Sequence, residues 1–430
     1  MNLHLTRLLE RYVIYMKAFN RQEYSSRFVA TLLFLTLIYS FFGYLLSDFF
    51  GYAILALVSL GILGYSALGN VAISRVQLLY IFLVLVFILI NLLPAAYSIS
   101  SETSIKTGIN RSVIFMVGIA LGLQGNWHRL APRFVAGLAL IHVFFTILSY
   151  FMPAFFSGWV LARLPVEVAM ASQTFMNAGL YAGITNQIGV NAFYMSIGVF
   201  ILYAHLVDRK QEKSISSKLA FLAFFLGLLL TGKRGHLLAT VFSLWFVSAV
   251  NAKLRGKTIL GKSVLAVVLS IVVVISLVIL FPEAANPFLR FSARVGGDIT
   301  SGRLILYGYA LDMFKQKPIL GWGTGTFNAL YGIGTHNAYL QILCENGLVG
   351  LATFGLILLF NFLNSYKELR KDIKLGGDNA QFLLFAIAMQ MFFMTYAMTG
   401  NPVNDGFILI VYLVATSIPF SIIRANKTET

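Results

Sequence analysis

Three short segments of the chain concentrate side chains that could do chemistry. They are TGKRGH at residues 231–236, SGR at 301–303 and HN at 336–337. The first two segments carry Lys233, Arg234 and Arg303, and a guanidinium group can hold a phosphate through two parallel hydrogen bonds. His336 has an imidazole with an ordinary pKa of about 6.5, so it can take a proton from an attacking hydroxyl. These residue types predict an anion site and a general base.

The rest of the chain has the composition of a membrane protein. Of the 430 residues, 58% are hydrophobic and only 11% are charged, whereas soluble proteins carry roughly 25% charged residues. The mean hydropathy is +0.81. Apolar runs of about 20 residues, enough to cross a bilayer, recur along the whole sequence. The single cysteine, Cys344, excludes a disulfide framework and a cysteine-based metal site.

We therefore expect an all-α polytopic membrane protein with about 12 transmembrane helices. With the N-terminus in the cytoplasm, most of the 32 Lys and Arg residues fall in cytoplasmic segments, as the positive-inside rule requires. This placement explains the net charge of +16 without a nucleic acid partner. The expected spans are residues 28–47, 51–68, 76–96, 110–124, 132–153, 188–207, 217–231, 235–250, 262–281, 339–363, 379–399 and 403–423.

The sequence predicts one integral membrane domain, residues 1–430, with two long extracytoplasmic loops. These loops are residues 154–187 and residues 282–338, the latter between the ninth and tenth spans. Long loops are uncommon without a function, so the chemistry is expected on this side of the membrane. In the first loop, Arg163 and Glu167 are spaced as an i,i+4 surface pair on a short helix.

The second loop contains the pattern of an interfacial helix. Thr300 or Ser301 is expected to cap a helix that begins near Arg303, and Pro318 is expected to end it. Its apolar face would lie on the membrane surface. That face consists of Leu304, Leu306, Tyr307, Leu311 and Phe314.

Five of the ten cations on the outer side lie near the outer leaflet, where the positive-inside rule gives them no purpose: Lys233, Arg234, Arg290, Arg294 and Arg303. The turn before Arg234 is too short to leave the interface, so its guanidinium either is neutralised by an anion or snorkels to water. Arg303 begins a helix whose free N-terminal amides also favour a phosphate.

His336 is the candidate general base, although a lone histidine is more often structural. His236 competes for this role, because it lies two residues after Arg234. The extracytoplasmic carboxylates form no D-x-D pair or other close cluster of the kind that holds Mg²⁺. We therefore expect neither a metal ion nor another cofactor.

Three elements in order resemble the signatures of the O-antigen ligase and O-antigen polymerase superfamily of membrane glycosyltransferases. The first is R-x3-L, from Arg234 to Leu238. The second is SGR followed by P-x-x-G-x-G, from Ser301 to Gly323. The third is HN-x9-G-x-x-G, from His336 to Gly350. Lys233 departs from the pattern, because small residues are frequent at its position, and it adds a cation beside Arg234.

The resemblance implies a GT-C-type enzyme of the bacterial cytoplasmic membrane, with both termini cytoplasmic and a periplasmic or extracytoplasmic active site. It implies metal-independent, inverting transfer of a glycan from an undecaprenyl diphosphate carrier. Arg234 and Arg303 would bind the diphosphate and His336 would act as base. Substrate binding would add Lys233 and the HN residue Asn337, together with the loop arginines Arg290 and Arg294.

The resemblance leaves the acceptor open. A repeat-unit polymerase, which uses a lipid-linked glycan as acceptor, is the first choice, since the second loop is short for a clamp on lipid A core. A ligase that transfers polysaccharide to lipid A core is the alternative. The expected partners are the donor, the acceptor glycan, membrane lipids, a chain-length regulator and a flippase. A lipid-linked glycan transporter is a third hypothesis, but the chain shows no repeated halves.

Overall fold

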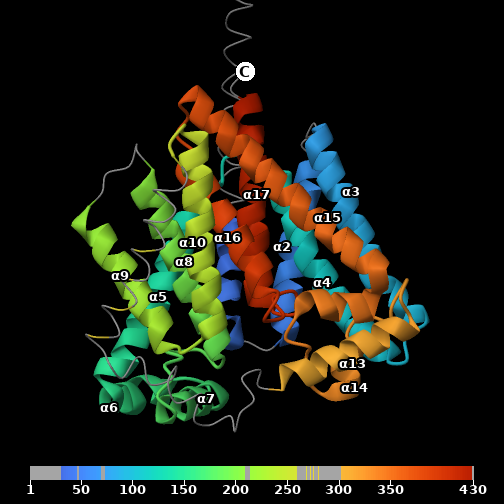
Figure 1. The fold of residues 1–430 in the computed structure, drawn as a ribbon, viewed down its shortest axis with the longest axis horizontal. Helices are drawn as coiled ribbons and strands as arrows, with labels where there is room; N and C mark the ends of the chain where they lie inside the picture. The colour runs from blue at the N-terminus through green and yellow to red at the C-terminus, as the bar shows by residue number, and fades with distance from the viewer. Residues whose placement is uncertain are drawn as a thin grey trace, which may run out of the picture.

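The protein is a bundle of long helices with two groups of short helices at one end (Figure 1). The computed structural model describes residues 31–45, 48–68, 73–208, 214–258 and 302–428, and the single positions 268, 272, 275 and 279. Within these residues every regular element is a helix and no β-strand occurs. The expected all-α class is confirmed for this part of the chain.

Ten helices of 16 or more residues make up most of the described chain. They are α2 (Asp48–Leu68), α3 (Arg75–Leu92), α4 (Ser101–Gly122), α5 (Ala131–Phe151), α8 (Ile188–Val207), α9 (Ile215–Leu230), α10 (Arg234–Leu254), α15 (Ala338–Leu375), α16 (Ala380–Tyr396) and α17 (Gly406–Thr428). The shorter elements are η1 (Gly43–Leu45), η2 (Leu93–Ala96), α6 (Pro153–Phe155), η3 (Phe156–Val160), η4 (Leu161–Arg163), α7 (Val166–Asn177), α13 (Arg303–Gln316) and α14 (Thr326–Tyr331).

Among the described residues, seven helices are long and apolar enough to cross a membrane, so the chain is an integral membrane protein. They are α3 with η2, α4, α5, α8, α10, α15 and α17. Four shorter apolar helices coincide with further expected spans: Thr31–Leu45, Ala53–Gly64, Ile215–Leu230 and Ala380–Tyr396. The expected ninth span, 262–281, lies outside the described residues except for four isolated positions.

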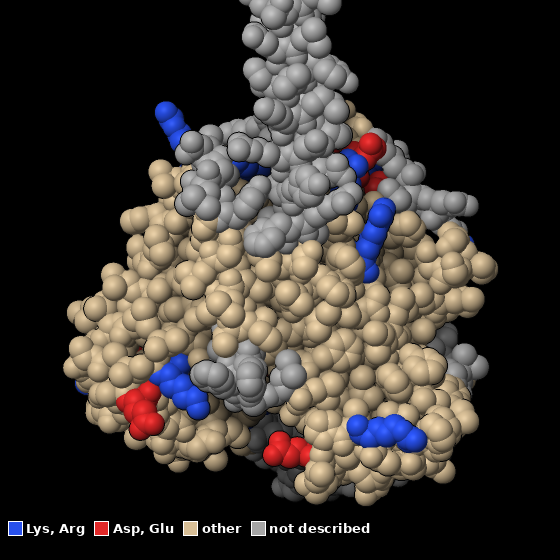
Figure 2. Space-filling model, turned by 180° about the vertical axis from the view of Figure 1, so that it is seen from behind, with Lys and Arg blue, Asp and Glu red and all other residues tan. Residues whose placement is uncertain are grey.

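Helices α16 and α17 form the centre of the bundle. α17 packs on α4 and α16, while α16 also packs on α8, α10 and α15. α17 is mostly buried, whereas fewer than half of the residues of α3, α5 and α10 are buried. Apolar side chains can stay exposed at this periphery because lipid tails are as apolar as the protein interior. On the face in Figure 2, charged side chains lie mainly toward the top and bottom, with a wide uncharged band between them.

The loop at 154–187 is largely helical, but the expected pair within it does not form. Pro165 precedes α7, so Arg163, at the end of η4, does not share a helix with Glu167. Arg163 instead donates to the carbonyl of Trp159 (2.6 Å) and lies 4.1 Å from the centroid of its ring. The i,i+4 interpretation was therefore wrong, because the proline starts a new helix.

Helix α13 begins at Arg303 and ends before Pro318, as expected, but its buried face differs. Ala310 and Met313 are buried against α15, and Leu306 and Phe314 pack beside them rather than on a membrane surface. Two other residues of the expected face, Leu304 and Leu311, are exposed. The expected caps, Thr300 and Ser301, lie outside the described residues, and Gly302 occupies the N-cap position.

Helix α15 contains a sharp kink near its start. Gly347 has φ 66° and ψ −165°, whereas the residues on either side are helical. A Cβ atom at this position would lie 2.1 Å from the carbonyl oxygen of Ile319, so only glycine fits. The kink turns residues 338–346 into a short separate segment, and this segment begins two residues after His336.

Candidate functional site

The turn between α9 and α10 brings two cations to the end of the bundle that carries α13 and α14 (Figure 1). Lys233 occupies the N-cap position of α10, and Arg234 is the first residue of that helix. Lys233 is half-buried, and burial followed by the charge of Arg303 lowers its pKa. Cations at a helix N-terminus oppose the helix dipole, so this turn is electrostatically suited to an anion.

Arg303 is the first residue of α13, and its charge acts on Lys233 in the turn before α10. The residue before it, Gly302, has φ 77°, which sets the direction in which the helix enters. Arg303 is half-buried, and its charge acts on both Lys233 and His336. A second helix N-terminus with an arginine therefore lies close to the first, although the two are far apart in the sequence.

His336 lies in the turn between α14 and α15 and is half-buried. Its φ of 55° is a left-handed conformation that residues other than glycine rarely adopt. Burial, followed by the charges of Arg303 and Lys233, lowers its pKa. The imidazole is therefore mainly neutral at pH 7 and available to accept a proton.

The residues on either side hold His336 in this conformation. The hydroxyl of Thr335 donates to the carbonyl of Asn337 (2.7 Å), and the N–H of Asn337 donates back to that hydroxyl (3.1 Å). The side-chain oxygen of Asn337 accepts from the first backbone N–H groups of α15, at Tyr339 and Leu340. Asn337, expected as a substrate ligand, thus uses its carboxamide oxygen as a helix cap.

The structure brings together cations and a histidine from three separate segments: Lys233, Arg303 and His336. Arg234 adjoins this group as the neighbour of Lys233 and is half-buried. The other two expected substrate ligands, Arg290 and Arg294, lie outside the described residues. The arrangement offers clustered positive charge for a diphosphate and a neutral base beside it.

Asp405, in the turn before α17, was not singled out from the sequence. Burial raises its pKa to about 6, although backbone N–H groups of Phe407 and Ile408 donate to it and oppose the rise. The charges of Asp405 and Arg303 both act on Tyr396, the last residue of α16. In the described part of the chain, no group of three or more His, Cys, Asp or Glu residues is arranged to hold a metal ion.

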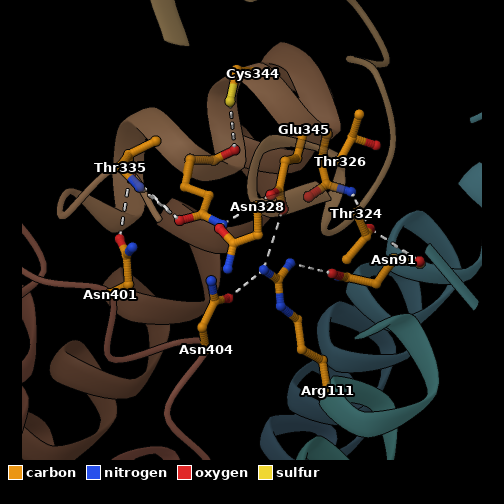
Figure 3. Close-up of polar contacts among 12 residues, drawn as sticks. Asn91, Arg111, Thr324, Thr326, Asn328, Thr335, Cys344, Glu345, Asn401 and Asn404 are labelled. Atoms are coloured by element: carbon orange, nitrogen blue, oxygen red, sulfur yellow. Dashed lines mark hydrogen bonds and ion pairs between the residues drawn. The ribbon is translucent and has the colours of Figure 1, made fainter. Parts of the chain in front are cut away.

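A buried ion pair joins Arg111 and Glu345 (Figure 3). Nη2 of Arg111 on α4 lies 3.3 Å from a carboxylate oxygen of Glu345 on α15, and both residues are almost fully buried. The guanidinium also donates to the side chains of Asn91 (3.0 Å) and Asn404. The pair therefore joins α3, α4, the kinked start of α15 and the turn before α17.

Gln341 links this ion pair to Thr335, the residue before His336. Its amide nitrogen donates to Glu345 (2.9 Å) and to Asn328 (3.1 Å). Its amide oxygen lies 3.4 Å from both the backbone nitrogen and the hydroxyl of Thr335. Thr335 also contacts Asn401 (3.3 Å), so the residue before His336 is held from two sides.

Two charged residues of this network stand out in the sequence, although the sequence does not show that they pair with each other. Arg111 and Glu345 both lie inside expected spans, where an ionisable side chain is costly and is usually paired. Each charge therefore called for a buried partner of opposite sign. Which pair meets depends on the packing of α4 against α15, and local sequence does not specify that contact.

The geometry agrees with what is found when the chain is compared with known proteins. Residues 219–355 match the family model described as O-antigen ligase, a range that contains Lys233, Arg234, Arg303, His336 and the kink of α15. A search of curated proteins finds no significant match. Residues 219–355 of this integral membrane protein thus form a segment that is similar to the O-antigen ligase family, which supports the resemblance to the O-antigen ligase and O-antigen polymerase superfamily.

Proposed function

We propose that the protein transfers a glycan from a polyprenyl diphosphate carrier to a hydroxyl of an acceptor glycan, on the outer face of the cytoplasmic membrane. The observation that carries this proposal is the convergence of Lys233, Arg303 and His336 at one end of the helical bundle. A diphosphate needs clustered cations, and a hydroxyl nucleophile needs a nearby neutral base. The family match supports the same class of reaction.

In the proposed step, an acceptor hydroxyl attacks the anomeric carbon of the donor sugar and His336 takes the hydroxyl proton. A new glycosidic bond forms, the bond from that carbon to the diphosphate oxygen breaks, and the diphosphate keeps the electron pair. Lys233, Arg234 and Arg303 stabilise the developing charge. Preorganised groups of this kind contribute several kcal/mol to transition-state stabilisation, without a metal ion. Attack opposite the leaving group inverts the anomeric configuration.

This function can take two forms, which differ in the acceptor that receives the glycan. As a repeat-unit polymerase, the protein would use a second lipid-linked glycan, which the short second loop favours. As a ligase, it would use lipid A core, and the description of the matched family favours this alternative at least as strongly. Both forms use the same donor chemistry at the same cations.

The test is an assay of the purified protein with lipid-linked repeat units, with and without lipid A core. A ladder of longer lipid-linked products identifies a polymerase, and transfer only to lipid A core identifies a ligase. Movement of the donor across vesicles without a new glycosidic bond would overturn the enzyme proposal and support a transporter.

His336→Ala should abolish transfer while the protein is still inserted and monodisperse, because the base is lost. The control is His128→Ala, which alters a histidine just before α5, at the other end of the bundle, that hydrogen-bonds with Ser421 and Asn379. Product formation by the His336 variant at the wild-type rate would refute its assignment as the base.

A further inference from the structure

A cavity lies at the end of the bundle opposite His336, between α5, α8, α9 and α16. Its volume is about 270 Å³, and its polar lining consists of Arg133, His205, Ser217 and Gln381. Helix α8 runs opposite to α5, α9 and α16, so the starts of these three helices meet the end of α8 here (Figure 1). This cavity is separate from the proposed transfer site.

The cavity is polar at its outer end and apolar farther in. Each polar lining residue lies in the first or last turn of its helix. Apolar lining residues such as Ala136, Leu202 and Phe385 lie about one turn deeper, roughly 5 Å along the helix axis. A site with a polar rim at the ends of membrane helices and an apolar interior has the polarity of a phospholipid at the headgroup boundary.

Arg133 supplies an uncompensated positive charge. Its side chain is exposed, no described residue forms an ion pair with it, and the lining contains no Asp or Glu. Arg255, at the same end of the bundle, is different because it lies 3.7 Å from a carboxylate oxygen of Asp208. The cavity thus combines a free guanidinium with hydroxyl and amide groups, which together can bind a phosphate.

We propose that this cavity binds one anionic phospholipid of the adjacent leaflet. Arg133 binds the phosphate, Ser217 and Gln381 provide hydrogen bonds, and the first part of the acyl chains lies against Phe385. Basic pockets between membrane helices are suited to anionic headgroups. Whole drug-sized ligands occupy pockets of about 300–1,000 Å³, so this cavity fits the headgroup and glycerol while the chains extend into the bilayer. Under the positive-inside orientation, this leaflet is cytoplasmic.

The test measures phospholipids that remain bound to the full-length protein in native mass spectrometry, after reconstitution with phosphatidylglycerol or with phosphatidylcholine. The wild type should retain one phosphatidylglycerol in preference to phosphatidylcholine. Arg133→Gln should reduce this retention about tenfold or more, because it removes charge-assisted hydrogen bonds. The matched control is Arg75→Gln, an exposed arginine that starts α3 at the same end and does not line the cavity.

A second variant separates a lipid from a soluble anion. Ala136→Phe keeps Arg133 but fills the apolar part of the cavity, so it should also reduce retention, and inorganic phosphate should not displace the lipid. Equal retention by the Arg133 and Arg75 variants would overturn the proposal. The proposal would also be overturned if the Ala136 variant retained as much phosphatidylglycerol as the wild type, or if inorganic phosphate displaced the lipid. The same holds if the wild type retained phosphatidylcholine as well as phosphatidylglycerol. None of these readouts depends on glycan transfer, so they leave the proposed function untouched.

Discussion

Lys233, Arg303 and His336 repel one another when they are all protonated, and the fold nevertheless brings them together. Burial and the two neighbouring cations lower the pKa of His336, and burial with Arg303 lowers the pKa of Lys233. Such a group is unfavourable in isolation and becomes favourable when an anion binds among the cations. The same charges that would hold a diphosphate also keep the imidazole neutral, so binding and proton transfer are coupled through these residues.

The pH profile of kcat/KM should reveal this coupling, because it reports the pKa values of the essential groups in the free enzyme. Since the pKa of His336 is lowered, the acid limb of the wild type should lie below about 6.5. Arg303→Gln removes a positive charge that disfavours the imidazolium, so the pKa should rise and the limb should move to higher pH. The variant should also lose on the order of 10²-fold in rate, as expected for one stabilising donor.

The control for this experiment is Lys315→Gln on the same helix. Lys315 is exposed and, among the described residues, pairs only with Asp312 (2.9 Å), so its removal should change neither the limb nor the rate. An Arg303 variant with the wild-type acid limb would show that its charge does not reach His336.

At the scale of elements, helix ends build the site. α10 and α13 begin with cations, and α15 begins two residues after His336. The kink at Gly347 gives α15 a short first segment, which carries Gln341 and Glu345 on the side of Arg111. The buried ion pair therefore supports the turn of His336 through Gln341. Breaking such a pair typically costs about 3–5 kcal/mol, so Gln341 is the better position at which to test the connection.

Gln341→Met removes the link between Glu345 and Thr335 without removing either charge of the ion pair. We expect kcat for glycan transfer to fall by about 10- to 100-fold, because small displacements of a catalytic group are this costly. The KM for the lipid-linked donor should change little, since the cations remain in place. Steady-state kinetics with varied donor concentration would measure both.

Gln390→Met is the matched control. Gln390 is 1% exposed, close to the 2% of Gln341, and its amide donates to Ser365 (2.7 Å) away from the cation group. Gln341 makes four hydrogen bonds and Gln390 makes one, each worth about 1 kcal/mol, so the melting temperature should fall more for Gln341→Met, and kcat is compared at a temperature where both variants are folded. If both retained the same kcat, Gln341 would have no positioning role.

At the scale of the whole molecule, the two ends of the bundle differ in content. One end carries α7, α13, α14 and the group of Lys233, Arg303 and His336 (Figure 1). The opposite end carries the C-terminus and Arg133 with its cavity. The distribution of Lys and Arg along the sequence predicts that the second end is cytoplasmic. The proposed function requires this orientation, because its substrates are expected on the outer face.

Cysteine labelling tests the orientation. Cys344 is buried and is the only cysteine, so Cys344→Ser provides the background. In that background, Lys315→Cys on α13 should react with a membrane-impermeant maleimide in intact cells stripped of any outer envelope. Lys371→Cys, near the end of α15, should react only after permeabilisation. Both lysines are exposed, so access to solvent is matched. The reverse pattern would place His336 in the cytosol.

Much of the architecture could be predicted because membrane helices are local features. The expected spans from α3 to α5, and α8, agree with the observed helices to within a turn or two at most ends, except that α4 begins nine residues early at Ser101. The helix from Arg303 to Pro318 was also found from its pattern, but the face that packs on the protein was not predicted. That face depends on contact with α15, which is distant in the sequence.

By itself, the amino-acid sequence determined that this is an all-helical membrane protein, where most of its helices lie, and which motifs carry its cations and its histidine. Hydropathy and short motifs suffice for this, because each depends on neighbouring residues. Only the tertiary structure decided that Arg111 pairs with Glu345, that Gln341 connects this pair to Thr335, and that His336 is held in a left-handed conformation. These features depend on how helices distant in the sequence pack together, and a buried charge in a span shows that a partner is needed without showing which residue provides it.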